Sequence, residues 1–335
     1  MKFPPLRLAA ARCRAGVCLG TALCAALGTP TATAAPALEA AAAVPGSTEA
    51  EPNELAESAR HAVRAATEWV ARGVDGWFGN QPFEDGGQIS NGHISLALLQ
   101  RQGEPINTAV RFNVHLRLPN VEKFTYVFLG RDDLRDVITD KPAEFSRQQR
   151  VTRDRGEPPA FVAGLGLNLP NSVDLRLGLR GGLKPYAQAR YMRAWVWPSG
   201  TSADFRETVF WAQDDRFGST TVMSLEHALS PALAVRWLAA ATITQEARKF
   251  EISSSLGAYQ SFGGQRLLSF EVLMDGKQGS GVGLSDYGGQ VKWQQPVYRD
   301  WLLAEILGGH FWPRADAASP RTRAWAVGSS LKMRF

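Results

Sequence analysis

The sequence predicts an all-β chain: an antiparallel transmembrane β-barrel of about fourteen strands, with twelve as the alternative, and a short N-terminal amphipathic helix. Three observations lead to this prediction. A secretory leader opens the chain, large apolar residues alternate with small or charged ones over most of its length, and short turns alternate with longer connections. A membrane barrel needs this alternation because one face of each strand meets lipid and the other meets water or packed polar side chains.

Residues 1–34 have the composition of a signal peptide. Four basic residues precede an apolar run over residues 15–27, and Ala32-Thr33-Ala34 offers small residues for cleavage before Ala35. That run is too short to remain in a bilayer as a spanning helix, and no later segment has the ~20 uninterrupted apolar residues required. If the chain crosses a membrane, we expect it to cross as strands.

The net charge of +5 overstates how basic the protein is. Residues 1–34 hold four of the 37 basic residues and none of the 32 acidic ones, which leaves 33 against 32 after cleavage. A nucleic-acid partner is therefore not expected. Cys13, Cys18 and Cys24 are the only cysteines of the chain, and all lie in the leader, so we expect no disulfide, thiolate metal site or cysteine nucleophile in the mature protein.

The rest of the chain divides into three parts. Residues 35–53 are rich in Ala, Pro, Ser and Glu and predict a flexible linker. Residues 54–79 predict an amphipathic helix with an apolar stripe, and residues 88–335 predict the barrel. The helix is either a packing element or a plug or latch. The short link after it restricts it to the periplasmic mouth or the lumen just inside, and its charged second face favours the mouth.

The strand pattern is clearest in four segments, which lie at residues 110–118, 173–180, 233–244 and 323–335. Two others, Lys123–Asp132 and Trp301–Phe311, are apolar on both faces. Turn residues such as Pro119-Asn120 and Pro170-Asn171 mark short connections, which alternate with longer polar ones. Counting back from the last strand, this alternation requires an even number of strands.

The chain resembles Gram-negative outer-membrane β-barrel proteins, and uncharacterised proteobacterial barrels with an N-terminal periplasmic helix in particular. The resemblance rests on the leader, the alternating strands, the aromatic residues near strand ends and the terminal Lys332-Met333-Arg334-Phe335. It implies an outer-membrane location with both termini in the periplasm, contact with outer-membrane lipid, and recognition of Phe335 by the barrel assembly machinery. It implies no activity.

The alternation also predicts which charged residues face the lumen. A bare Arg or Lys facing lipid near the midplane costs about 2–4 kcal/mol, so charges should point inward. Bases outnumber acids in this set, which indicates either a narrow pore that weakly prefers small anionic solutes or a lumen filled by its own salt bridges. The predicted lumen-lining residues are Arg111, His115, Arg117, Asp174, Arg176, Arg180, Arg190, Glu226, Arg236, Glu271 and Lys292.

One motif points to catalysis. His93-Ile94-Ser95 places an imidazole and a hydroxyl on one strand face, as a base and a nucleophile would require, and outer-membrane lipid hydrolases carry a His-x-Ser of this kind. Here no Asn-Gly follows the serine, and no residue that would orient His93 is identifiable. His227 and His310 have no carboxylate at metal-ligand spacing. A lipid hydrolase is thus the alternative to a pore or structural barrel, and we expect no metal or cofactor.

Overall fold

The computed structural model describes residues 52–75, 83–120, 125–142, 160–245, 250–277, 283–314 and 318–335. The predicted signal peptide and the predicted linker up to residue 51 lie outside the described residues. So do residues 76–82, which include the end of the predicted helix. None of the helices in the described ranges is both long and apolar enough to cross a membrane.

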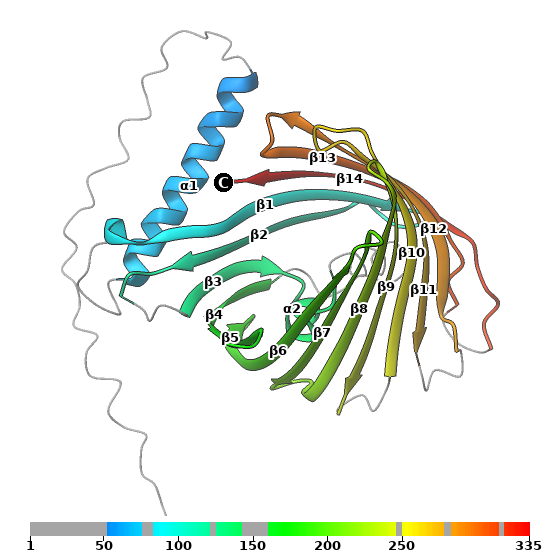
Figure 1. Cartoon of the computed structure of the whole chain (residues 1–335), viewed down its shortest axis with the longest axis horizontal. Helices are drawn as coiled ribbons and strands as arrows, with labels where there is room; N and C mark the ends of the chain where they lie inside the picture. The colour runs from blue at the N-terminus through cyan, green and yellow to red at the C-terminus, as the bar shows by residue number, and fades with distance from the viewer. Residues whose placement is uncertain are drawn as a thin grey trace, which may run out of the picture. The chain divides into compact units, whose positions relative to one another are not determined.

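The fold is a closed antiparallel barrel of fourteen strands, in which β1 pairs with β14 to complete the ring (Figure 1). The predicted fold class and strand number are confirmed. The strands are β1 (Gln88–Arg101), β2 (Asn107–Arg117), β3 (Thr125–Asp132), β4 (Ala160–Leu169), β5 (Val173–Arg180), β6 (Lys184–Trp197), β7 (Thr201–Ala212), β8 (Arg216–Ser230), β9 (Leu233–Thr244), β10 (Phe250–Ser261), β11 (Leu267–Lys277), β12 (Asp286–Tyr298), β13 (Leu302–Phe311) and β14 (Ala324–Arg334).

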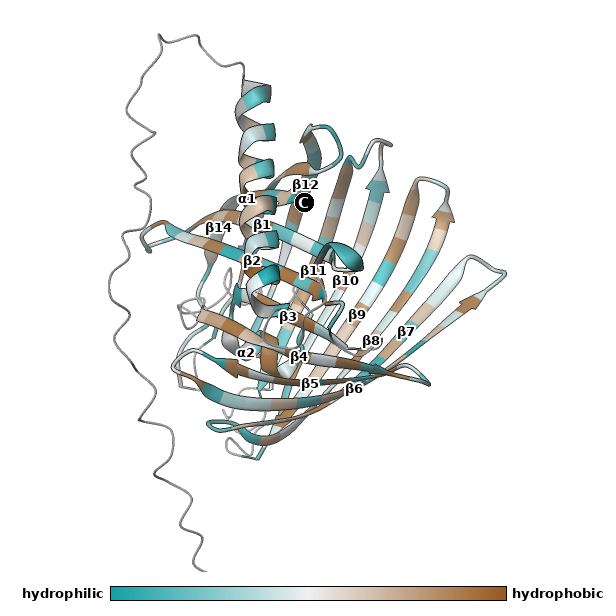
Figure 2. Cartoon of the chain, turned by 90° about the vertical axis from the view of Figure 1, so that its left-hand side faces the viewer, coloured by the Kyte–Doolittle hydropathy of each residue, from teal (hydrophilic) through white to brown (hydrophobic). Residues whose placement is uncertain are grey.

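The register assigns every strand residue to one of two faces, because cross-strand partners point to the same side of a sheet. One face carries most of the exposed large apolar side chains, such as Leu96, Leu177 and Phe270, and this is the outer surface of the barrel. The other face carries most of the charged side chains and is the lumen. Figure 2 shows hydrophobic and hydrophilic residues alternating along the strands. An apolar outer wall around a polar lumen is the arrangement of an outer-membrane barrel.

The two ends of the barrel differ. The first strand begins and the last strand ends at one end, which also holds the short connections, such as that between β4 and β5. The opposite end carries the longest connection, between β3 and β4, which includes helix α2 (Leu134–Thr139). Figure 1 shows α2 within the curve formed by β3–β8.

Helix α1 (Pro52–Asp75) packs against the outside of the barrel, and a 3₁₀ turn (Phe83–Asp85) comes shortly before β1. Ala71 is fully buried in a cluster with Val114 and Leu116, which the register places on the outward face of β2. These two side chains are 3% and 1% exposed, whereas Val110, on the same face farther along β2, is 41% exposed. The helix therefore shields the outer wall near the strand ends.

Polar contacts anchor α1 on both sides of the seam at which β1 and β14 close the barrel. Asp75 accepts hydrogen bonds from the backbone N–H (3.3 Å) and the side-chain amide (2.9 Å) of Asn120, in the turn after β2. Towards its N-terminus, Arg60 Nε donates to the carbonyl oxygen of Arg334, at the end of β14 (3.2 Å). A 24-residue helix is about 36 Å long, enough to reach across several strand ends. The helix thus straps the seam from outside.

This position differs from the expectation that the helix lies at the mouth or just inside the lumen. The end of the barrel is the expected one, but the apolar stripe of α1 packs on the outward side chains of β2 instead of covering the opening. The reason is chemical. Near the ends of β1, β2 and β14, the outward face presents a cluster of apolar side chains that Ala71 of α1 joins, whereas the lumen face there carries His93 and Arg334.

Candidate pore lining and constriction

The register places all eleven residues of the predicted lumen set on the lumen face. Arg111 lies opposite Ser95, His115 opposite Phe128, Asp174 opposite Arg190, and Glu226 opposite Arg236. The full set on this face is Arg111, His115, Arg117, Asp174, Arg176, Arg180, Arg190, Glu226, Arg236, Glu271 and Lys292. Most of these charges belong to ion pairs, so the lumen wall is a network of neutralised groups.

Helix α2 folds back into the lumen and docks on the wall. Ile138 is fully buried in a cluster that includes Phe128, Tyr186 and Phe210, all of them lumen-facing. Gln188 Nε2 donates to the carbonyl oxygens of Val137 (2.7 Å) and Ile138 (2.5 Å), which caps the end of the short helix. An apolar side chain and two satisfied carbonyl groups therefore hold α2 against β3–β7.

Asp140 fastens the same segment electrostatically. It follows α2 in a left-handed conformation (φ 53°), which Asp and Asn tolerate better than most residues. Its carboxylate pairs with Arg190 and with Arg206 Nε (3.1 Å), and Thr208 Oγ1 donates to it (2.9 Å). Arg206 also donates to the Asp140 carbonyl oxygen (2.8 Å). We call Asp140, Arg190, Arg206 and Thr208 the clamp.

A second network adjoins the clamp. Arg176 Nε pairs with Asp174 (3.0 Å) and donates to the hydroxyl of Tyr126 (2.8 Å), while Arg190 Nη1 also approaches Asp174 (3.8 Å). The Tyr126 ring fits only because Gly166 faces it, since a Cβ atom on Gly166 would lie 2.1 Å from the ring. Clamp and network together set three guanidinium groups against two carboxylates, which leaves one net positive charge beside α2.

The far wall has its own network around Glu271, which is 3% exposed. Tyr259 donates to Glu271 Oε1 (3.0 Å), Gln290 donates to Oε2 (2.5 Å), and Lys292 Nζ lies 3.6 Å from Oε1. Arg236 in turn donates to the Tyr259 hydroxyl (3.0 Å). These contacts hold the side chains of β9–β12 against the wall.

The rim of the barrel at the α2 end carries a third cluster of paired charged side chains. Arg180 Nη2 and Lys184 Nζ lie 3.1 and 2.9 Å from Asp214 Oδ2 in the turn between β7 and β8. The hydrogen bond from Lys184 lowers the pKa of the Asp214 carboxyl below its ordinary value, and the charges of Lys184 and Arg180 add to this effect. Asp214 is therefore ionised at neutral pH.

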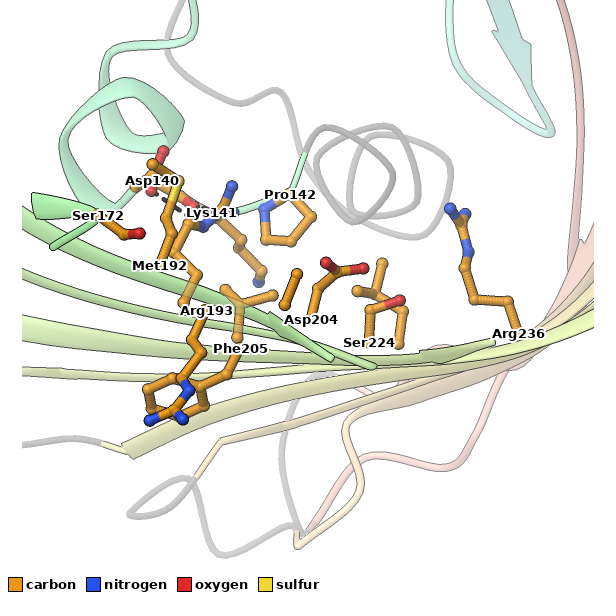
Figure 3. Close-up of a pocket in the computed structure, with 14 residues that line it drawn as sticks. Asp140, Lys141, Pro142, Ser172, Met192, Arg193, Asp204, Phe205, Ser224 and Arg236 are labelled. Atoms are coloured by element: carbon orange, nitrogen blue, oxygen red, sulfur yellow. Dashed lines mark hydrogen bonds and ion pairs between the residues drawn. The ribbon is translucent and has the colours of Figure 1, made fainter. Parts of the chain in front are cut away.

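Two cavities lie along the lumen wall, and the larger one borders the segment that follows α2. One of about 700 Å³ is bordered by Lys141, Asp204 and Arg206, and one of about 550 Å³ by Glu226 and residues of the β8–β9 turn. Arg236 borders both, so they meet at its side chain. Figure 3 shows Asp204 and Arg236 pointing to the same side of the sheet as Asp140 and Lys141.

Two carboxylates in these cavities lack a partner. In the part of the chain that the structure describes, no hydrogen bond or ion pair reaches the side chain of Asp204 or Glu226. Asp204 lines the larger cavity and Glu226 the smaller one. They are the acidic groups with which a passing solute would interact directly.

The His93 and Ser95 pair of the hydrolase alternative faces the lumen and not the outer wall. His93 and Ser95 share the lumen face, where they lie opposite Arg334 and Lys332 of β14. Lipid contacts the opposite face, and the nearest charged groups are cations, which would not stabilise an imidazolium ion. The described residues also contain no group of three or more side chains placed to hold a metal ion.

Sequence reasoning missed the residues that hold α2 and the segment after it against the lumen wall. Asp140 lies in a connection, and Arg206 and Tyr126 lie in strands whose pattern is less clean than that of the predicted set. Alternation within β7 and β3 assigns Arg206 and Tyr126 to the lumen, so that signal was present. No local pattern indicates that Asp140 returns to meet them.

No protein-family model and no curated protein matches the chain in sequence. Solved structures of similar fold include the KdgM porin in complex with disordered oligogalacturonate, at 7% identity and a TM-score of 0.36 over 72% of this chain and 99% of that one. OccK11 (OpdR) of Pseudomonas aeruginosa gives 10% identity and a TM-score of 0.40 over 75% and 97%. OmpT of Vibrio cholerae has 9% sequence identity and a TM-score of 0.38, over 74% of this chain and 98% of that one. These likenesses in barrel architecture carry no inference about what passes through this chain. The chain is itself a closed antiparallel β-barrel of fourteen strands with an apolar outer wall and a charged lumen.

Proposed function

We propose that this protein is a narrow outer-membrane pore for small solutes, with a weak preference for anions. The observation that carries the proposal is the pair of lumen cavities that meet at Arg236 beside the docked α2. The net positive charge of the clamp and its neighbouring network favours anions at this level. Asp204 and Glu226 oppose that preference and keep it weak.

The difference between the two ends of the barrel supports an orientation in the membrane. We place both termini, α1 and the short turns in the periplasm, and the connection that carries α2 outside the cell, as in other outer-membrane barrels. Phe335 supports this placement, because its ring lies on the outward face over Gly92 and its N–H donates to the Gly92 carbonyl oxygen (3.1 Å). It is thus available to the assembly machinery until β1 closes against β14.

Planar-bilayer recording tests the pore directly. Purified protein in a bilayer with a KCl gradient should give small unitary conductances and a reversal potential displaced towards that of chloride. A membrane with inserted, folded protein and no conductance would contradict the pore and would leave a barrel filled by its own salt bridges.

Removing the two unpaired acids should strengthen the anion preference. In the variant Asp204→Asn/Glu226→Gln, the cavities keep their shape but lose two negative charges, so the reversal potential should move further towards that of chloride. The matched control is Glu54→Gln, which removes an exposed carboxylate on α1 outside the barrel. An equal shift in the control, or no shift in the double variant, would show that solutes do not pass Asp204 and Glu226.

A further inference from the structure

The outer wall of the barrel carries one carboxylate that its lipid setting does not explain. Glu207 lies on β7, where the lumen face is formed by its neighbours Arg206 and Thr208. Its cross-strand partners, Tyr191 on β6 and Thr221 on β8, also point outward. An ionisable side chain on the lipid face is unfavourable, and within membranes such groups usually mark a functional contact.

The position of Glu207 is deep within the apolar band. Trp211 lies four residues away towards one rim, and Ala203, the cross-strand partner of Trp195, lies four residues away towards the other. Trp195 and Trp211 are both outward and partly exposed, as expected of the aromatic residues at the two membrane interfaces. Four residues of a tilted strand cover about 10 Å, so the short Glu207 side chain reaches neither interface.

Two hydroxyl groups hold the Glu207 carboxylate in place, but they fill only about half of its hydrogen-bond acceptor sites. Thr221 Oγ1 donates to Oε2 (2.6 Å), and the hydroxyl of Ser219 donates to Oε1. A carboxylate offers about four acceptor sites. Within the described residues these two hydroxyl groups are its hydrogen-bond partners, so the remaining acceptor sites are directed away from the barrel.

A complementary cation lies beside it on the same face. Arg193 is exposed on β6, pairs across the sheet with Phe205, and is therefore a diagonal neighbour of Glu207. Figure 3 shows Arg193 and Phe205 on the side of the sheet opposite to Asp204 and Arg236. Arg193 does not pair with Glu207. Its guanidinium carbon instead lies 5.3 Å from the centroid of the Trp195 ring, towards the interface.

We propose that a second copy of this chain docks on the outer face of β6–β8, with Glu207 of each copy paired to Arg193 of the other. Two copies in one membrane share their orientation, so a two-fold axis parallel to the membrane normal relates them and each contact occurs twice. An axis between the two diagonal neighbours brings each carboxylate to the partner guanidinium. The long Arg193 side chain spans the offset of two residues in depth.

Small side chains lie on the same outward face near this pair. On β6, Ala189 comes two residues before Tyr191 and Ala187 comes before that, and Ala239 and Ala241 lie on the same face of β9. Small residues let backbones of neighbouring membrane segments come close, and polar side chains then hold them together. The wall formed by β11 and β13 presents large apolar residues such as Phe270, Val272 and Ile306 and no such charged pair, which suits contact with lipid.

Disulfide cross-linking in the native outer membrane locates the contact. On a background in which Cys13, Cys18 and Cys24 are replaced by alanine, Tyr191→Cys lies next to the proposed axis and should give a cross-linked dimer on mild oxidation. Val272→Cys is the matched control, an outward residue on the far wall. Equal cross-linking at both positions, or none at Tyr191→Cys, would overturn the interface.

Charge exchange tests the pair itself. Glu207→Arg and Arg193→Glu should each lower the dimer fraction at least tenfold in native mass spectrometry, because each puts like charges together, and the double exchange should restore it. Retained heat-modifiable mobility shows that each variant is folded. If a charge-reversal variant does not fold, Glu207→Gln serves as the test instead. It keeps the contacts with the hydroxyl groups of Ser219 and Thr221 and should still weaken the dimer, because it removes the negative charge. A double exchange that stays monomeric, or a monomeric native protein, contradicts the proposal.

Discussion

Asp140→Asn is expected to raise the single-channel conductance several-fold and to increase the preference for anions. The substitution removes the charge that Arg190 and Arg206 share, and it keeps the left-handed backbone that Asn also tolerates. The two guanidinium groups then repel each other, and α2 is held mainly by Ile138 and Gln188. Breaking a buried ion pair by removing one partner costs about 3–5 kcal/mol, enough to release a single helical turn from the wall.

Conductance and reversal potential of Asp140→Asn in planar bilayers measure this effect. Thr208→Val is the matched control, because it deletes the hydrogen bond from one neutral hydroxyl to Asp140 and leaves both ion pairs intact. It should change the conductance little. Wild-type conductance in folded Asp140→Asn would mean that α2 does not narrow the path of the solute.

Ala71→Asp is expected to detach α1 and to lower the stability of the barrel without widening the pore. Ala71 is fully buried against Val114 and Leu116, where a carboxylate would have no hydrogen-bond partner. Burying such a group costs on the order of 1–3 kcal/mol or releases the helix. Because α1 straps the seam between β1 and β14 from outside, its loss should make opening of the barrel easier.

The temperature at which the folded band disappears in heat-modifiable electrophoresis measures this stability, and planar-bilayer recording measures the pore. Ala65→Asp, on an exposed side of the same helix, is the control and should alter neither. A rise in the conductance of Ala71→Asp, with the barrel still folded, would place the helix over the lumen and contradict the outer-wall position.

Local periodicity was sufficient for the architecture of this protein. In β2, the alternation that starts at Val110 assigns each side chain to lipid or lumen, because a strand has a period of two residues. The alternation of short and long connections predicts an even number of strands, and the structure has fourteen. The lumen position of all eleven predicted residues follows from the same period.

Contacts between distant segments decided the features that shape function. Asp140 meets Arg190 and Arg206 because α2 returns to the wall, and α1 chooses the outer face of β2 because apolar side chains remain uncovered there. Neither contact can be predicted from the periodicity of the sequence. Each depends on which surface still lacks a packing partner once the barrel has closed. The sequence by itself determined the barrel and the direction of its strand side chains. The tertiary structure alone decided which charges are neutralised, where α2 docks on the lumen wall, and that Glu207 has a cation beside it on the outer face.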